Sequence, residues 1–110
     1  MESILEIVSQ NIMYNNQYDR IIKDEFISTI NRISFGDKLI EQLNRSMDYV
    51  LLYNTLNEEL KFIISKRKYF KQKLHGNVRR ILNDYMKYRI DRLNNIIINI
   101  WTILSMCISN

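Results

Sequence analysis

Apolar residues recur every three or four positions along almost the whole chain, which is the spacing of one face of an α-helix. The first third holds two such stripes, and the polar cluster Asn15-Asn16-Gln17 between them favours a break into two helices. The stripes consist of Ile4, Ile7, Val8 and Ile12, and then of Ile21, Ile22, Phe26, Ile30 and Ile33. The pattern therefore predicts helical structure over residues 4–33.

Two later sites are typical of helix ends. Ser34-Phe35-Gly36-Asp37 interrupts the apolar spacing, and glycine suits a left-handed helix end while Ser or Asp suits the N-cap of the next helix. Asn54-Thr55 has Glu58 three residues after the threonine, which is the capping-box pattern. We expect one helix to end at the first site and another to begin at the second. The stripe between them consists of Leu39, Ile40, Leu43, Met47, Val50 and Leu51.

The clearest break in the chain is His75-Gly76-Asn77. A helix opening at about Val78 is expected to run about 30 residues, or about 45 Å. One side of it carries Val78, Ile81, Leu82, Tyr85, Arg89, Leu93, Ile96, Ile100 and Leu104. The chain has no proline and only two glycines, which argues against β-rich folds. The 110 residues thus predict a single all-α domain, a four- to five-helix bundle with a long basic C-terminal helix.

Charge is distributed unevenly along the chain. Residues 61–92 hold eleven cations against two anions, a net +9, whereas residues 1–60 hold five cations against ten anions, a net −5. Such asymmetry indicates an acidic protein partner or a nucleic-acid backbone, although long basic helices are also often simply solvated.

Residues that carry out catalysis do not gather into any recognisable constellation. His75 is the only histidine and lies in a predicted turn, where a role at a helix C-terminus is favoured. One histidine and one cysteine are too few for an ordinary structural zinc site, and the two glycines are too far apart to cradle a phosphate. Glu58-Glu59 is interpreted as the acidic start of a helix. We therefore expect no enzyme activity, no cofactor and no metal.

The apolar run from Ile96 to Ile108 is too short for a membrane span, and residues 1–10 lack the features of a signal peptide. The default expectation is a soluble intracellular protein. Within that run, Cys107 is expected to be a small core residue. Trp101 is expected in the core or at a partner surface.

The last helix carries the most information about function. Tyr85, Arg89 and Arg92 are spaced i, i+4, i+7 and share one face. An arginine beside a packing face either covers apolar surface with its stem or holds a carboxylate with its planar fork. The helix therefore predicts acidic partners, either in the acidic first half of the chain or on another chain. Asp84 and Asp91 are interpreted as ion-pair partners of the neighbouring arginines.

Residues 77–93, read as N-V-R-R-I-L-N-D-Y-M-K-Y-R-I-D-R-L, resemble the characteristic helix of GINS-complex subunits, most closely the PSF-one type (the first partner of Sld five). Arg79, Arg80, Tyr85, Arg89, Arg92 and Leu93 fall at family-like spacing. A second match is Phe35 to Ser46, similar to the opening helix of the family domain. The resemblance covers about residues 34–101. It leaves residues 1–33 as an N-terminal helical extension and lacks the family's small C-terminal β-domain.

The resemblance implies a non-enzymatic subunit of a four-protein helical assembly in the nucleus. That heterotetramer joins the Mcm ring and Cdc forty-five in the replicative helicase, and so serves DNA replication initiation and fork progression. The implied partners are the other GINS subunits and those helicase components, with no membrane and no small-molecule substrate. The residues expected at the partner interface are Arg80, Tyr85, Arg89, Arg92, Leu93 and Trp101.

Two alternatives remain open on the residues alone. The first is an unrelated helical adaptor that binds acidic protein surfaces. The second is a direct nucleic-acid binder, for which a DNA contact, even a weak one, is expected first at the basic patch. That patch consists of Lys66, Arg67, Lys68, Lys71 and Lys73, with Arg79 and Arg80 following on the next helix.

Overall fold

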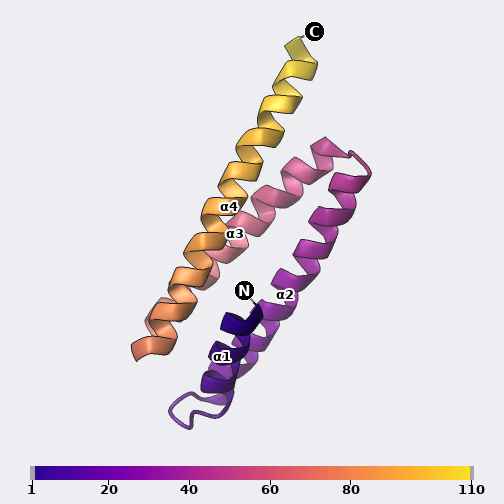
Figure 1. Ribbon diagram of the computed structural model, residues 1–110. Helices are drawn as coiled ribbons and strands as arrows, with labels where there is room; N and C mark the ends of the chain where they lie inside the picture. Colours follow the sequence, from indigo (N-terminus) through magenta and orange to yellow (C-terminus); the bar gives the residue numbers. More distant parts are fainter. Residues whose placement is uncertain (1, 110) are drawn as a thin grey trace.

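Four α-helices, joined by short turns, make up nearly all of the chain in the computed structural model (Figure 1). The structure describes the backbone of residues 2–109 and the side chains of residues 4–108. The helices are α1 (Glu2–Met13), α2 (Arg20–Arg45), α3 (Tyr49–Lys73) and α4 (Gly76–Ser109). Within residues 2–109 no strand occurs, so the predicted all-α bundle is confirmed.

The helix ends are set by local capping and by two residues with positive φ. The Asp19 side chain accepts a hydrogen bond from the Ile22 N–H at 3.0 Å and starts α2. The Asp48 side chain starts α3 in the same way, through the Leu51 N–H at 3.3 Å. Gly76, at φ 62°, occupies the left-handed region that glycine tolerates, and it opens α4. The predicted breaks at Asn15–Gln17 and His75–Asn77 are confirmed.

The predicted break at Ser34–Asp37 is wrong, because α2 continues through it to Arg45. Gly36 is buried inside the helix, and a Cβ atom built on it would overlap the carboxylate of Glu59 on α3. The glycine therefore permits a close approach of two helices and does not end one. The predicted boundary between residues 33 and 34 falls within this continuous helix.

The predicted helix start at Asn54-Thr55 is also wrong, because α3 begins six residues earlier, after Asp48. Met47, at φ 56°, reverses the chain before that cap. Glu58 and Glu59 consequently lie in the middle of α3 and not at its start. The same turn breaks the predicted apolar stripe, and its members Met47, Val50 and Leu51 are exposed.

The molecule is elongated, with extents of 58 × 22 × 20 Å. α3 packs against both α2 and α4, and α1 packs against α4 and α2. Among the described residues, the backbones of α2 and α4 do not come within contact distance of each other. Figure 1 shows that the N-terminus lies partway along the bundle, whereas α4 extends beyond the turn that joins α2 to α3.

Because α1 is short, the bundle has two unlike halves. The closed half comprises α1, residues 20–33 of α2, 61–73 of α3 and 76–88 of α4, and in it α1 packs on α2 and α4. In the open half, residues 34–45 of α2, 49–60 of α3 and 89–109 of α4 have no fourth helix beside them. Figure 1 shows this difference, with α1 confined to one end of α2.

The core is continuous but is densest in the closed half. Phe26 and Phe70 meet edge to face there, with ring centroids 6.0 Å apart, and both are fully buried. In the open half, Leu52 and Leu56 of α3 carry the core onward beneath α4. The stripe predicted for the last helix is confirmed, since its members are buried or half-buried on the side that packs on the other helices.

Two residues predicted for the core lie outside it. Cys107 is exposed, and Trp101 keeps 55% of its surface exposed. The prediction of a core position is wrong for Cys107, and of the two places expected for Trp101 only the partner surface stays a prediction. The reason is that the antiparallel α3 begins at Tyr49, opposite about residue 100 of α4, and leaves later residues without a neighbour. We call residues 101–109 the overhang.

Candidate functional site: a groove between α2 and α4

A groove of about 520 Å³ runs along the open half, between α2 and α4, in the space that α1 occupies in the closed half. Leu52 of α3 forms part of its floor, and Ile40 of α2 with Leu93 and Ile96 of α4 form its apolar flanks. The groove exists because α2 and α4 are 26 and 34 residues long, whereas α1 has only 12.

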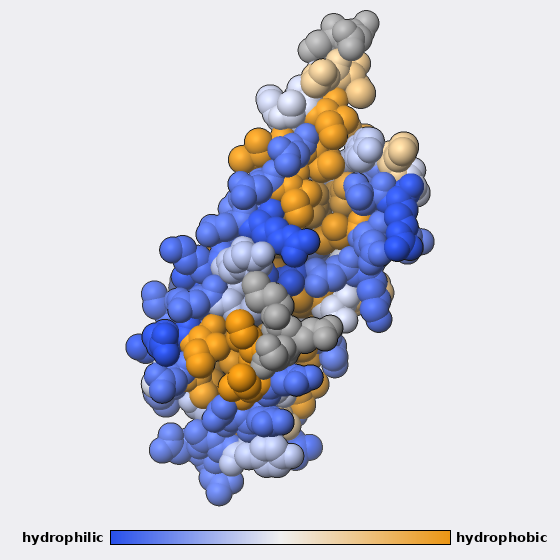
Figure 2. Space-filling model, in the orientation of Figure 1, coloured by the Kyte–Doolittle hydropathy of each residue, from blue (hydrophilic) through white to orange (hydrophobic). Residues whose placement is uncertain are grey.

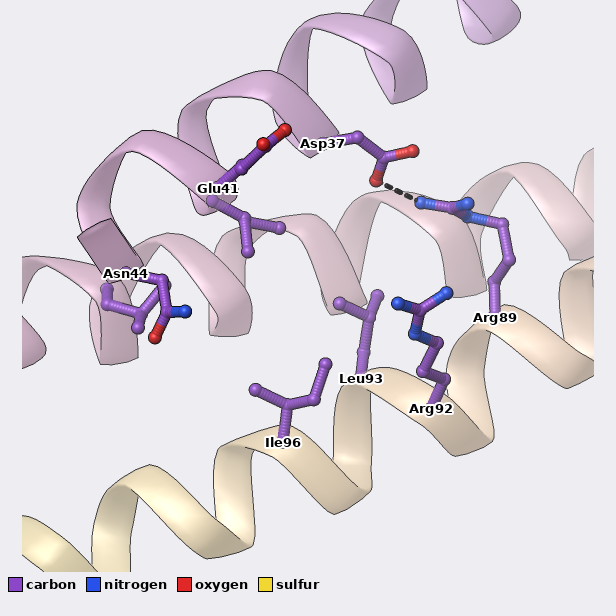
Figure 3. Close-up of a pocket in the computed structure, with 9 residues that line it drawn as sticks. Asp37, Glu41, Asn44, Arg89, Arg92, Leu93 and Ile96 are labelled. Carbon is purple, nitrogen blue, oxygen red and sulfur yellow. Dashed lines mark hydrogen bonds and ion pairs between the residues drawn. The ribbon is translucent and has the colours of Figure 1, made fainter.

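The two rims of the groove carry opposite charge (Figure 3). Asp37, Glu41 and Asn44 stand on successive turns of α2, at the spacing i, i+4, i+7. Arg89 and Arg92 stand on α4 across the opening. The groove therefore offers a partner an apolar strip between one acidic and one basic edge.

Arg89 closes the end of the groove nearest α1 by pairing with Asp37 across the gap (Figure 3). Burial by itself lowers the pKa of Arg89, but the hydrogen bond to Asp37 and the nearby Tyr85 outweigh it, so the pKa is raised above its ordinary value. The guanidinium is thus held charged, 5.9 Å from the centre of the Tyr85 ring. Its Nε atom is buried and has no hydrogen-bond partner in the described structure.

Arg92 differs from Arg89 in its surroundings. It is exposed, and among the described residues no carboxylate forms an ion pair with it. On the opposite rim, Glu41 pairs with Arg45 one turn along α2, at 2.5 Å, and both side chains remain largely solvated. Such an exposed pair contributes little to stability, so Glu41 can leave Arg45 for a partner with only a small loss of free energy.

Above the groove, the overhang exposes apolar side chains on several faces. Trp101, Ile103, Met106 and Ile108 each keep between 38% and 86% of their surface exposed, and Ile98, just before the overhang, keeps 60%. Figure 2 shows apolar residues gathered in this half of the molecule, between the C-terminal half of α4 and the neighbouring helices. No charged residue follows Arg92 in the sequence. Large exposed apolar patches of this kind mark interaction surfaces.

The structure brings some of the sequence-predicted interface residues together and separates others. Tyr85, Arg89 and Leu93 are buried or half-buried and lie side by side on α4, with Arg92 beside them. Trp101 lies on the overhang. Arg80 is exposed in the closed half, nine residues before Arg89, and does not reach the groove.

The acidic partners predicted for the basic helix α4 are found in part. The pairing of Arg89 with Asp37 joins α4 to the acidic first half of the chain, as predicted. Asp84 and Asp91 are both exposed, and neither forms an ion pair with an arginine among the described residues, so that interpretation is wrong.

The predicted basic patch divides into two parts. Lys66 pairs with Glu25 of α2 and lies against the Phe62 and Tyr69 rings, and Arg67 donates a hydrogen bond to Asn83 at 2.9 Å. These two cations join helices to one another. Lys68, Lys71 and Lys73 remain exposed near the end of α3, and any nucleic-acid contact of this patch would fall to them.

An ion pair that sequence reasoning missed lies at the border between the two halves. Glu59 is only 4% exposed, yet it carries a carboxylate, which pairs with Arg32 of α2. Arg32 in turn lies 5.1 Å from the centre of the Phe62 ring. Gly36 leaves the space that this carboxylate occupies. A buried charge without such a partner would be strongly destabilising, so the three residues act as a unit.

The lining of the groove is made of apolar, acidic, amide and basic side chains. Its nine lining residues include no histidine, cysteine, serine, threonine or tyrosine that could serve as a nucleophile or a neutral-pH base. Among the described residues, no group of three or more His, Cys, Asp or Glu side chains is placed to hold a metal ion. Within residues 2–109, no helix has the combined length and apolar character needed to cross a membrane.

No family model matches the chain, and comparisons with curated proteins and with solved structures found no similar protein. The resemblance to GINS subunits consequently rests on the residues that carry it, and it stays a prediction.

Proposed function

We propose that this protein is a non-enzymatic helical subunit that works by burying the open half of its bundle against other protein chains. The observation that carries the proposal is the combination of a helix-sized groove with an apolar overhang at the same end of the molecule. A four-helix bundle normally surrounds its core on all sides, and here one side of one half is left to solvent. Apolar surface of this kind gains free energy when a partner covers it.

The charged rims support a protein partner. An interface core is apolar and is ringed by polar groups that set orientation and exclude wrong partners. Leu93 and Ile96 supply the first element, while Arg92 and Glu41 supply the second. Because Arg92 has no ion-pair partner in the described structure, it is the residue that we expect to receive a carboxylate or a helix C-terminus.

For the identity of the assembly, the proposal follows the sequence resemblance. The chain would be a subunit of the GINS complex, a nuclear scaffold that joins the Mcm ring and Cdc forty-five in the replicative helicase. The arginine-containing stretch that resembles the family helix forms one wall of the groove, which supports this reading. An unrelated helical adaptor that binds through the same groove is the alternative.

The test uses two arginines on one helix as a matched pair. Arg92→Glu and Arg80→Glu change the net charge equally, and both residues are exposed, but only Arg92 lines the groove. The tagged full chain is purified from the cells that make it, and co-purifying proteins are quantified by mass spectrometry. We expect Arg92→Glu to lose most of its partners and Arg80→Glu to keep them, with unchanged helix content by circular dichroism.

Equal retention of partners by both variants would contradict the role of the groove. The identity of the recovered proteins tests the assembly separately. Stoichiometric recovery of three further helical subunits together with Mcm proteins is the expected result. Recovery of proteins unrelated to replication, still sensitive to Arg92→Glu, would reject the GINS assignment and support the adaptor.

A further inference from the structure

The open half has the dimensions and the direction of a missing helix. α1 and α2 are antiparallel, and Leu5 and Ile30 line a common hollow near the beginning of α1. From about residue 33 of α2 onward, the same space is the groove. The stretch of α2 in the open half, residues 34–45, is about twelve residues long, so a helix of about 18 Å fits beside it. To continue the up-and-down order, the occupant must run in the direction of α1, antiparallel to α4.

The overhang of α4 has the chemistry that this space accepts. It carries no charge, so nothing in it would be buried unpaired. Ile103 lies on the groove side, at helical spacing from Ile96, and Leu104 continues the side that packs on α3. Trp101 lies on another face of the helix. If the overhang entered the groove of a second copy, this face would be turned toward α2 of that copy. Most sides of the overhang would therefore contact an apolar wall of the groove.

The end of the overhang also complements the basic rim. The last turn of α4 has no basic residue, so the negative end of its dipole meets no cation there. Arg92 has no ion-pair partner in the described structure, and the buried Nε of Arg89 lacks an acceptor. The free carbonyl groups at a helix C-terminus are acceptors that suit the exposed Arg92.

From these features we infer that the occupant of the groove is the overhang of a second copy of this chain. Two copies related by a two-fold axis would each insert the overhang into the groove of the other, with the two α4 helices antiparallel. Pairing centred near Ile100 places residue 108 of one copy opposite about residue 92 of the other. The contact is self-complementary, as a two-fold interface requires, and it completes two four-helix bundles at once.

This inference rests on the first part of the proposed function, that the open half is buried against other protein chains, and it names the occupant. A dimer through the groove would count against the GINS assignment, in which the four subunits are different proteins. The first test is the mass of the purified full chain in solution, by sedimentation across a range of concentrations. We expect twice the chain mass of 13.4 kDa at micromolar concentration. Ile103→Glu should give a folded monomer, because it places a charge on the inserted face. Ile21→Glu, at an exposed isoleucine of the closed half, should remain dimeric.

The second test measures the arrangement of the two copies. In a Cys107→Ser background, a spin label is attached at Asp91→Cys, an exposed position nine residues from the expected pairing centre. Antiparallel insertion places the two labelled positions about 27 Å apart along the helices, because each residue rises 1.5 Å. A dipolar distance of roughly 30 Å supports the inference. A distance of roughly 55 Å, which end-to-end contact between the helix tips would give, overturns it.

The outcomes separate this inference from the proposed function. A chain that is monomeric at every concentration overturns the second copy as occupant. If that monomer still binds other proteins and loses them with Ile103→Glu, the occupant is a helix from another subunit and the proposed function stands. A dimer lost with Ile21→Glu but kept with Ile103→Glu also overturns the inference, because the interface would then lie on the closed half.

Discussion

The closed and open halves of the bundle are made of the same helices but are stabilised to different degrees. Of the eleven fully buried side chains among the described residues, nine lie in the closed half and only Leu52 and Leu56 lie in the open half. Exposed apolar residues occur in both halves, but Trp101, Met106 and Ile108 of the open half follow one another closely on the overhang. The short α1 therefore determines which half of the core is covered within one chain, and under the proposed function the other half is covered by a second chain.

Side-chain packing should contribute far more to stability in the closed half than on the overhang. Phe70→Ala removes a fully buried ring from the closed half and should lower the free energy of unfolding by about 3–5 kcal/mol. Trp101→Ala removes a ring that is already half in solvent and should change it by no more than about 0.5 kcal/mol. Urea unfolding at a concentration that keeps the chain monomeric measures both. Similar losses for the two variants would show that the overhang is packed within one chain.

An intermediate effect is expected at the border, where Gly36 faces the Glu59 carboxylate. Gly36→Ala should destabilise the protein by about 1–3 kcal/mol, because its Cβ displaces that carboxylate from Arg32. In a Glu59→Ala background the space is free, and alanine is the better helix former. There the same substitution should stabilise by up to about 1 kcal/mol. A double-mutant cycle measured by urea unfolding tests this reversal of sign. If the sign does not reverse, the glycine is not needed for the close approach of α2 and α3.

Tyr69 of the closed half should make a small contribution to the dependence of stability on alkaline pH. Burial, and then the nearby carboxylates of Glu25 and Asp19, raise the pKa of Tyr69 above 10.0. The folded state therefore favours the neutral phenol, so this stabilisation is complete below pH 10 and is lost as the pH rises through the folded-state pKa. In thermal melts at alkaline pH, the melting temperature of the Tyr69→Phe variant should fall less steeply with pH than that of the unmutated protein. A slope equal to that of the unmutated protein would assign the alkaline loss to other groups.

The sequence was sufficient for the fold class and for the helix breaks that strong local signals mark. Asn15–Gln17 and His75–Asn77 are polar or glycine-containing stretches flanked by clean apolar stripes, and both breaks are confirmed. Gly36 and Thr55 have equally good local signals, yet both lie inside helices. Tertiary contacts determine the structure at these positions. Gly36, for example, makes room for the carboxylate of Glu59, which is 23 positions away in the chain.

The candidate site was predictable on one wall only. The α4 wall was found because Tyr85, Arg89 and Leu93 combine apolar and arginine residues at helical spacing. The α2 wall was missed, although Asp37, Glu41 and Asn44 show the spacing i, i+4, i+7 that could have indicated it. Sequence patterns do not say which helices lie across from each other. The groove depends on that, and on the length of α1.

The order in which the helices pack has a consequence for the rate of folding. α2 with α3, and α3 with α4, are neighbours in sequence, so their contacts close short stretches of chain. The contact of α1 with α4 must instead bring together residues separated by most of the chain, and its chain-closure entropy is unfavourable. We therefore expect rapid formation of the three-helix part and late docking of α1. Pulse-labelling hydrogen exchange tests this order, which fails if the amides of α1 gain protection together with those of α3.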